Sequence, residues 1–270
     1  MPASRQELLT ALPFDRYQQA YVSAREWLKC IGGGLNVTRA VSRTNKSVVW
    51  EVMSRGNSRF FLKRHLRRDN FDIELLTLEG LEHTHRAPNV IAFDPDLLLI
   101  LMTALKPLPT SMGFSQRCAA LVEAVAAVHG GFLYSQELRL KLLPTLTLTR
   151  VAEENSRFSD LFRSHDCHLH FSERKRSVFG GEHVSFALFD IKLCHLMHNA
   201  GSAALVDFDA SAPGLYEEYD LITLARILAP HGWSMEMIAD HYSEYRNKLG
   251  GWTSSDLTLD LVDVFNACLA

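Results

Sequence analysis

The chain of 270 residues is 47% hydrophobic, which suffices for one large core or two small lobes. Its net charge of −3 gives no global attraction to nucleic acid or to an acidic membrane, so we expect no nucleic-acid partner. Because Arg5 and Glu7 interrupt any apolar N-terminal stretch and the five cysteines are irregularly spaced, we expect a cytoplasmic chain without a secretory signal or a disulfide framework.

The first segment, residues 5–30, has apolar residues at helical spacing, with a break at Pro13. Gly32-Gly33-Gly34 follows it, as a C-terminal cap would. A phosphate-binding loop is the alternative for these glycines, but no helix start follows them, as the usual nucleotide-binding motifs require. Residues 1–34 are therefore predicted to form an N-terminal helical extension.

Three strand-like segments separated by polar turns come next: residues 37–41, 48–52 and 59–63. Turn residues between such runs predict an antiparallel meander. A helix is predicted over about residues 69–83, and two more strands over 90–93 and 97–102, before a connector at 103–107. This part of the chain is thus predicted to be a small sheet with one helix.

After residue 112 the pattern becomes mainly helical. A strongly amphipathic helix is predicted over residues 118–129, ending at Gly130-Gly131. Another contains residues 221–228, Ser234 can cap a helix running to Leu249, and Ser254 or Ser255 can cap a last one reaching Leu269. The complete pattern predicts an α+β fold.

Lys63 closes the third predicted strand after two apolar residues. A buried lysine in such a position needs a partner for its charge. Glu74, in the predicted helix, is placed to reach back to it, with Glu79 as the competing partner. The alternative is an edge-strand lysine with a buried stem and a hydrated amine, and a solvated Glu74.

Two carboxylates each follow an apolar run that is typical of a buried strand. Asp190 follows residues 186–189, and Asp207 follows residues 203–206. Such groups would meet at one edge, where their mutual repulsion favours a metal ion between them. Capping or turn roles for both are the alternative.

The segment Asp190-x-Lys192-x-x-His195 resembles the kinase catalytic loop D-x-K-x-x-N, with histidine in place of asparagine. This replacement, and the stretch Phe-Phe-Leu-Lys-Arg-His at 60–65, resemble the bacterial lipopolysaccharide core kinases, which phosphorylate Kdo or heptose. The resemblance covers about residues 35–230.

Further segments resemble the aminoglycoside and choline kinase relatives. Tyr219-Asp220-Leu221 is similar to a segment of theirs in which the aspartate is structural. The resemblance implies a two-lobed protein-kinase-like fold, with a nucleotide-binding N-lobe at residues 35–105 and a mainly helical C-lobe at residues 106–270.

The resemblance also implies which residues bind ATP. Lys63 would contact the ATP phosphates, and Glu74 would pair with this lysine. Met102, Thr103 and Leu105 would lie in the hinge that faces adenine.

The catalytic and metal residues are implied in the same way. Asp190 would orient the acceptor hydroxyl, and Lys192 would stabilise the transferring phosphoryl group. His195 and Asp207 would bind Mg²⁺. Imidazole is a softer ligand than magnesium prefers, so His195 would otherwise favour Mn²⁺ or hold Asp190 by a hydrogen bond.

The turn at residues 43–47 departs from the glycine-rich phosphate loop of protein kinases. It resembles instead the short turn of the aminoglycoside-kinase relatives, and its amides and Ser47 could meet phosphate. An ordinary hairpin turn is the alternative. Leu188 and Phe189 stand where the His and Arg before the catalytic aspartate are expected, which argues against control by a phosphorylated activation loop.

The leading hypothesis is an ATP-dependent kinase of a lipopolysaccharide core sugar, in peripheral contact with the inner face of the inner membrane. The basic clusters at residues 63–68 and 174–176 would touch anionic headgroups or sugar phosphates, or else are solvated faces. The alternatives are a kinase of a soluble small molecule or a protein side chain, and a nucleotide-binding pseudokinase. Only 13 positions separate Asp207 from Asp220, which disfavours a regulated protein kinase.

Two other groups of residues invite a different chemistry. The segment from His165 to His170 contains zinc-ligand residue types, but neighbours this close in sequence would strain a tetrahedral site. Cys194 is a candidate nucleophile without an evident orienting group, so a packed thiol is favoured.

Overall fold

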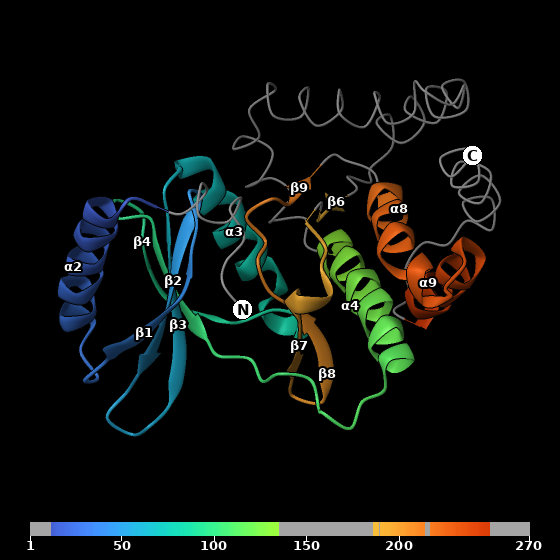
Figure 1. Cartoon of the computed structure of the whole chain (residues 1–270), viewed down its shortest axis with the longest axis horizontal. Helices are drawn as coiled ribbons and strands as arrows, with labels where there is room; N and C mark the ends of the chain where they lie inside the picture. Colours follow the sequence, from blue (N-terminus) through green and yellow to red (C-terminus); the bar gives the residue numbers. More distant parts are fainter. Residues whose placement is uncertain (1–11, 135–185, 189, 214–216, 249–270) are drawn as a thin grey trace.

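A five-stranded antiparallel sheet in the order β1-β2-β3-β5-β4 forms one end of the structure, a computed structural model that describes residues 12–134, 186–188, 190–213 and 217–248 (Figure 1). We call this end the N-lobe. Its strands are β1 (Asn36–Arg43), β2 (Ser47–Met53), β3 (Arg59–His65), β4 (Val90–Asp94) and β5 (Leu99–Thr103). The predicted meander is confirmed.

The last strand begins later than predicted. Leu98 has a φ of 55°, a left-handed conformation that a strand cannot contain, so β5 starts at Leu99. The turn before it is closed by Asp94, whose Oδ1 accepts hydrogen bonds from the amides of Asp96 and Leu97, both at 2.9 Å. This aspartate makes the turn longer than the three residues that the sequence pattern indicates.

Helix α2 (Phe14–Ile31) covers one face of the sheet (Figure 1). Its Ala24 and Leu28 share a buried cluster with Trp50 of β2, Leu62 of β3 and Leu101 of β5. Pro13 precedes its first residue and Gly32 ends it, as predicted. The predicted N-terminal extension therefore contributes to the core of the N-lobe, because its apolar side is what buries this face of the sheet.

Helix α3 (Arg68–Leu81) lies against the opposite face and is followed by the short helix η1 (Glu82–Thr84). Successive residues of a strand point to opposite faces. In β3, Leu62 therefore packs toward α2, whereas Lys63 and His65 point toward α3. This alternation places the two basic side chains on the side of the sheet that faces the rest of the molecule.

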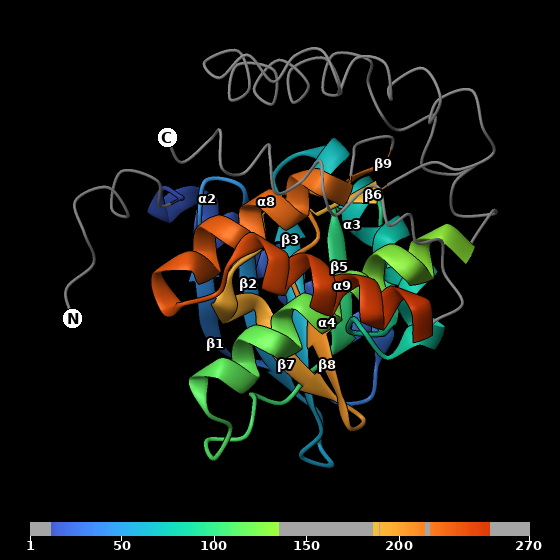
Figure 2. The same cartoon turned by 90° about the vertical axis from the view of Figure 1, so that its right-hand side faces the viewer.

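The C-lobe is built around helix α4 (Phe114–Tyr134), with α8 (Glu217–Leu228), η3 (Ala229–His231) and α9 (Met235–Lys248). Helix α9 packs against both α4 and α8 (Figure 2). The amide of Met237 donates to Ser234 Oγ, so the predicted cap is confirmed. No helix in the described part has the length and apolar character that a bilayer crossing requires.

Short strands of the C-lobe lie between α4 and α8 in the sequence. Strand β6 pairs with β9, and β7 pairs with β8 in a hairpin. These segments are β6 (Phe186–Ala187), η2 (Leu193–His195), β7 (Leu196–Asn199), β8 (Ser202–Leu205) and β9 (Ala212–Pro213). The helix predicted after Ser254 or Ser255, the cluster at 165–170 and the basic residues 174–176 fall outside the described residues.

The prediction that a helix ends at Gly130-Gly131 is wrong, because α4 continues to Tyr134. A Cβ added at Gly131 would lie 2.9 Å from Thr84 Cγ2 and 3.3 Å from Leu81 Cδ2. Glycine inside a helix costs about 1 kcal/mol relative to alanine. At this position it permits close packing of α4 against the end of α3 and η1, which local sequence does not reveal.

Arg86 links the segment after α3 to the C-lobe by hydrogen bonds. Its Nη1 donates to Glu123 Oε1 of α4 at 3.0 Å and to the Ala203 carbonyl of β8 at 2.9 Å, and Nη2 contacts the Tyr245 hydroxyl of α9. The Arg86 carbonyl accepts from the Leu205 amide at 2.8 Å. The strand that leads to Asp207 is thus bonded directly to the chain that leads out of α3.

Candidate active site

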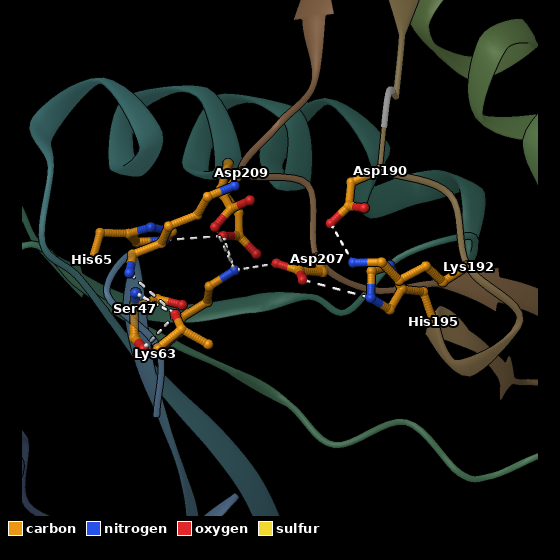
Figure 3. A network of polar contacts seen from close by, with 11 residues as sticks. Ser47, Lys63, His65, Asp190, Lys192, His195, Asp207 and Asp209 are labelled. Carbon is orange, nitrogen blue, oxygen red and sulfur yellow. Dashed lines mark hydrogen bonds and ion pairs between the residues drawn. The ribbon is translucent and has the colours of Figure 1, made fainter. Parts of the chain in front are cut away.

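Lys63 lies in the interior of the sheet, because β3 runs between β2 and β5. Its Nζ lies 2.6 Å from Glu74 Oε2 of α3, and the two side chains are 5% and 2% exposed (Figure 3). Glu79, the competing partner, is exposed. The edge-strand alternative for Lys63 is therefore wrong, and the predicted pair with Glu74 is formed.

At both members of this pair, charge pairing has a larger effect on the pKa than burial. Burial by itself lowers the pKa of Lys63, but the carboxylates of Glu74, Asp207 and Asp209 more than offset it, so this pKa is raised. Burial raises the pKa of Glu74, but the charge of Lys63 and the hydrogen bond from His65 lower it to about 2. The pair is accordingly ionised at neutral pH.

We expect Glu74 to make the fold sensitive to acid. Its folded-state pKa of about 2 lies below the ordinary value of 4.5, so its stabilisation is complete above about pH 4.5 and is lost as the pH falls toward 2. At neutral pH, such a shift contributes on the order of 3 kcal/mol to the free energy of unfolding. Denaturant titrations of wild type and Glu74→Gln between pH 7 and pH 2 measure it.

The difference in stability between wild type and Glu74→Gln should narrow across this interval, because protonated glutamate resembles glutamine. Burial raises the pKa of Asp209, which gives the opposite pH dependence, but that contribution is common to both proteins. Glu79→Gln, on the exposed side of the same helix, is the control and should follow wild type. A difference for Glu74→Gln that stays constant down to pH 2 would contradict the ion pair.

The predicted catalytic residues lie on the segment between β6 and β7. Lys192 Nζ donates to Asp190 Oδ2 at 2.7 Å, and the side chains are 51% and 37% exposed. Burial lowers the pKa of Lys192, but the hydrogen bond to Asp190 and the negative charges of Asp190 and Asp207 together outweigh it, so this pKa is raised. The His195 amide donates to the Lys192 carbonyl at 3.0 Å, which closes the loop at η2.

Asp207 follows β8 in a left-handed conformation, with a φ of 73°. Aspartate and asparagine adopt this region more readily than most other residues. The Val206 amide donates to the His195 carbonyl at 3.1 Å, so the loop of Asp207 is tied to the catalytic loop. The Asp207 Oδ2 atom lies 3.7 Å from His195 Nε2.

Asp220 accepts a hydrogen bond from the chain just before the catalytic loop. Its Oδ2 accepts hydrogen bonds from the Leu188 amide at 2.6 Å and from His129 Nε2 at 2.9 Å. A neutral His129 that donates from Nε2 leaves Nδ1 to accept from the Tyr242 hydroxyl, 2.8 Å away. The structural role implied for Asp220 agrees with this geometry, whereas sequence reasoning missed His129, which is one of several polar residues on α4.

The two halves of the site meet at Lys63. Its Nζ lies 2.5 Å from Asp207 Oδ1 and 3.5 Å from Asp209 Oδ2 (Figure 3). Residues from β3, α3 and the segment after β8 thus surround one ammonium group. The sequence reasoning assigned no role to Asp209, although this residue belongs to the Asp207-Phe208-Asp209 segment that resembles the kinase family.

Asp190, His195 and Asp207 form the set that could hold a metal ion. One potential ligand atom from each lies within 4.8 Å of the others, and all three side chains are partly exposed. His65, Glu74 and Asp209 satisfy the same distance criterion. Glu74 and Asp209 of that second set already pair with the Lys63 ammonium and the whole set is buried, so the partly exposed first set fits a divalent cation better.

Two amides of the turn between β1 and β2 are bonded within the turn itself. The amides of Lys46 and Ser47 donate to Thr44 Oγ1, at 3.2 and 3.1 Å, and the Ser47 side chain is buried. These amides are therefore satisfied within the turn, and the contact of Ser47 with phosphate stays a prediction. The ordinary hairpin alternative describes this turn, because the Thr44 hydroxyl satisfies the amides that a phosphate would need.

Met102 and Thr103 end β5, and Leu105 begins the connector to the C-lobe. The Thr103 amide donates to the Asn89 carbonyl at 2.9 Å, and the Leu105 carbonyl accepts from Arg59 Nη2 at 3.3 Å. Met102 and Leu105 are buried. The segment lies where the lobes join, and its contact with adenine stays a prediction.

The basic residues beside Lys63 are mostly neutralised by near neighbours. Arg67 Nη2 lies 2.6 Å from Asp69 Oδ2, and Arg68 Nε lies 3.0 Å from Asp72 Oδ1. These contacts favour the solvated-face interpretation of this cluster. Cys194 is exposed, so the expectation of a packed thiol is wrong, because η2 turns it away from the core.

No protein-family model matches the chain, and no curated protein sequence matches it. Solved structures do match it over most of its length. The macrolide 2'-phosphotransferase MphH from Brachybacterium faecium has a TM-score of 0.55 and 16% identity, over 93% of this chain and 89% of that one. The chain has a protein-kinase-like fold. The two-lobed α+β architecture expected from the sequence is thereby confirmed.

Two further structures extend this likeness. An ethanolamine kinase from Plasmodium vivax has a TM-score of 0.54 and 11% identity, over 87% of this chain and 72% of that one. The choline kinase LicA from Streptococcus pneumoniae has a TM-score of 0.51 and 12% identity, over 92% and 87% of the two chains. At these identities the kinase-like fold is what the chains share.

Proposed function

We propose that the chain is an ATP-dependent phosphotransferase that transfers the γ-phosphoryl group to a hydroxyl of a small molecule. The observation that carries this proposal is the Lys63 ammonium group, held between Glu74 and Asp207 where the lobes meet. Phosphoryl transfer from ATP needs such a lysine, a metal-binding acid, and an acid that orients the acceptor. Asp190, on the neighbouring loop, supplies the last of these.

Each residue has a role in the transfer. The acceptor oxygen attacks the γ-phosphorus, the bond to the β,γ-bridging oxygen breaks, and ADP leaves. Asp190 accepts the hydroxyl proton through its carboxylate, which Lys192 orients by bonding Oδ2. Lys192 is half-exposed and positively charged, so it can also stabilise the negative charge of the transferring group.

Asp207 and His195 would hold a Mg²⁺ or Mn²⁺ ion, and Lys63 would contact the phosphates. Such an ion neutralises phosphate charge. Lys63 has carboxylate partners on both lobes, so it can contact phosphate while Glu74 keeps it in position.

As the acceptor we propose a sugar hydroxyl of lipopolysaccharide core, Kdo or heptose. The D-x-K-x-x-H arrangement of Asp190, Lys192 and His195 supports this choice, because it resembles the loop of those kinases. Such an acceptor would place the enzyme in the cytoplasm, in peripheral contact with the inner membrane. The ion pairs of Arg67 and Arg68 weaken the argument for direct lipid contact through that cluster.

A soluble small molecule is the second candidate acceptor. The macrolide phosphotransferase and the choline and ethanolamine kinases that share the fold support it, since their names state such acceptors. A pseudokinase is the third candidate, and the Thr44-bonded turn between β1 and β2 supports it. A protein acceptor is disfavoured by the short segment between Asp207 and Asp220.

We expect ATP with Mg²⁺ to raise the melting temperature of the wild-type protein. A ligand at 100 times its Kd stabilises the folded state by about 2.7 kcal/mol, which is several degrees for a chain of this size. Differential scanning fluorimetry with millimolar ATP, with and without Mg²⁺, measures this effect. The absence of any shift would contradict nucleotide binding and with it the proposed function.

Labelled ATP distinguishes the acceptors. Incubation with core-lipid extract, with a panel of soluble amino alcohols and sugars, and with a protein mixture should label the lipid extract. Label found only in the soluble panel would overturn the core-sugar assignment and leave the phosphotransferase proposal intact. Binding of ATP without transfer to any acceptor, together with no ATP hydrolysis, would favour the pseudokinase.

A further inference from the structure

His65 is a buried basic residue of the site, and the proposed reaction assigns it no role. It lies on β3 two residues after Lys63, on the same face of the strand, and its side chain is 0% exposed. Its Nε2 lies 3.0 Å from Glu74 Oε2 (Figure 3). The ring packs edge-on against Phe71 of α3, with 6.1 Å between the centroids.

Glu74 Oε2 is the contact atom for two basic groups. Lys63 Nζ lies 2.6 Å from this oxygen and His65 Nε2 lies 3.0 Å from it. A carboxylate oxygen only accepts, so in this contact His65 acts as the donor when Nε2 carries the ring proton. With the Glu74 side chain 2% exposed, bulk water cannot substitute for a lost donor.

This sharing matters when Lys63 contacts a nucleotide. The ammonium would then divide its donors between Glu74 and phosphate oxygens, and its present contact with Asp207 at 2.5 Å would compete. A carboxylate with a single donor could rotate to follow the lysine. The second donor, fixed by β3 and by the packing of Phe71, opposes this rotation.

We propose that His65 is a positioning residue for ATP. Its Nε2–H donor holds the Glu74 carboxylate in the orientation that keeps the Lys63 ammonium directed at the phosphates. The inference rests on the proposed function, since it assigns a role within the same site. A purely structural histidine, which fills space beside Phe71, is the competing explanation.

Two substitutions separate these explanations. His65→Leu removes the donor and keeps an apolar side chain in the pocket, whereas His65→Gln supplies an amide donor at a similar reach. We expect His65→Leu to raise the KM for ATP about tenfold or more, as expected for loss of a hydrogen bond to a charged group. His65→Gln should stay within about threefold of wild type, and the KM for the acceptor should not change in either variant.

Thr77→Val is the matched control for a general disturbance of α3. Thr77 is buried in the same helix, and its hydroxyl donates to the Ile73 carbonyl at 2.7 Å and not to the Glu74 carboxylate. This variant should lower the melting temperature without changing the KM for ATP. Calorimetric titration with ATP gives the binding constant of each variant directly, without turnover.

The outcomes are distinguishable. Equal affinity for ATP in folded His65→Leu and wild type would overturn the positioning role and leave the proposed function standing. An equal loss of ATP affinity in His65→Gln and His65→Leu would also overturn it, because the shape of the histidine ring, and not its hydrogen-bond donor, would then be what matters. A wild-type protein that neither binds ATP nor transfers phosphate would overturn the proposed function together with this inference.

Discussion

Replacement of Asp190 by asparagine is expected to lower kcat about a thousandfold, the middle of the range for a general acid–base group. The asparagine oxygen can still accept from Lys192, so the loop keeps its hydrogen bond. The amide, however, cannot take the proton of the acceptor hydroxyl. Steady-state kinetics with varied ATP and varied acceptor should show the loss in kcat, with the KM for ATP little changed.

Asp240→Asn is the matched control for this variant. Asp240 is an exposed aspartate on α9, so its substitution removes the same charge outside the cluster of Lys63, Asp190 and Asp207. It should retain wild-type kinetics. Asp190→Asn with wild-type kcat and unchanged pH dependence would show that another group receives the proton.

Asp207→Asn is expected to remove the dependence of nucleotide binding on Mg²⁺ and to lower kcat/KM about a thousandfold. That loss corresponds to about 4 kcal/mol of transition-state stabilisation, as expected for a metal that neutralises phosphate charge. Asparagine adopts the left-handed conformation that the φ of 73° requires, so the substitution changes charge with little backbone strain. Alanine at this position would remove the charge and also strain the backbone.

The thermal shift caused by ATP, measured with increasing Mg²⁺, is the readout for Asp207→Asn. Wild type should respond to the metal, and Asp190→Asn should keep most of this response because His195 and Asp207 remain, whereas Asp207→Asn should respond to ATP alone. This contrast separates loss of metal binding from loss of proton transfer. A Mg²⁺ response that is unchanged in Asp207→Asn would exclude this aspartate as a metal ligand.

Local patterns in the sequence were enough to predict much of the N-lobe. Alternating apolar residues and polar turns predicted the β1–β3 meander, because strand period and turn chemistry are properties of neighbouring residues. The cap at Ser234 and the helix boundary at Pro13 were predictable for the same reason. Errors occurred where contact with a distant segment determines the local structure. Gly131 is an example, because a Cβ atom at this position would clash with Thr84.

The candidate site divides in the same way. The sequence by itself determined which residue types were available: Lys63 after an apolar pair, the Asp190-x-Lys192 segment, and Asp207 after a buried run. It left open whether Lys63 sits at an edge, whether Glu74 or Glu79 pairs with it, and whether Ser47 faces phosphate. Each of these depends on what lies opposite a side chain in space.

Only the tertiary structure decided the first two of these questions. Strand β5 pairs with β3 and makes Lys63 central, and α3 presents Glu74 rather than Glu79 to it. Lys63 and Asp207 are 144 positions apart yet lie 2.5 Å from each other. Contacts of this kind follow from how both faces of one sheet are buried, by α2 on one side and α3 on the other, and a chemical pattern along the chain carries no record of that packing.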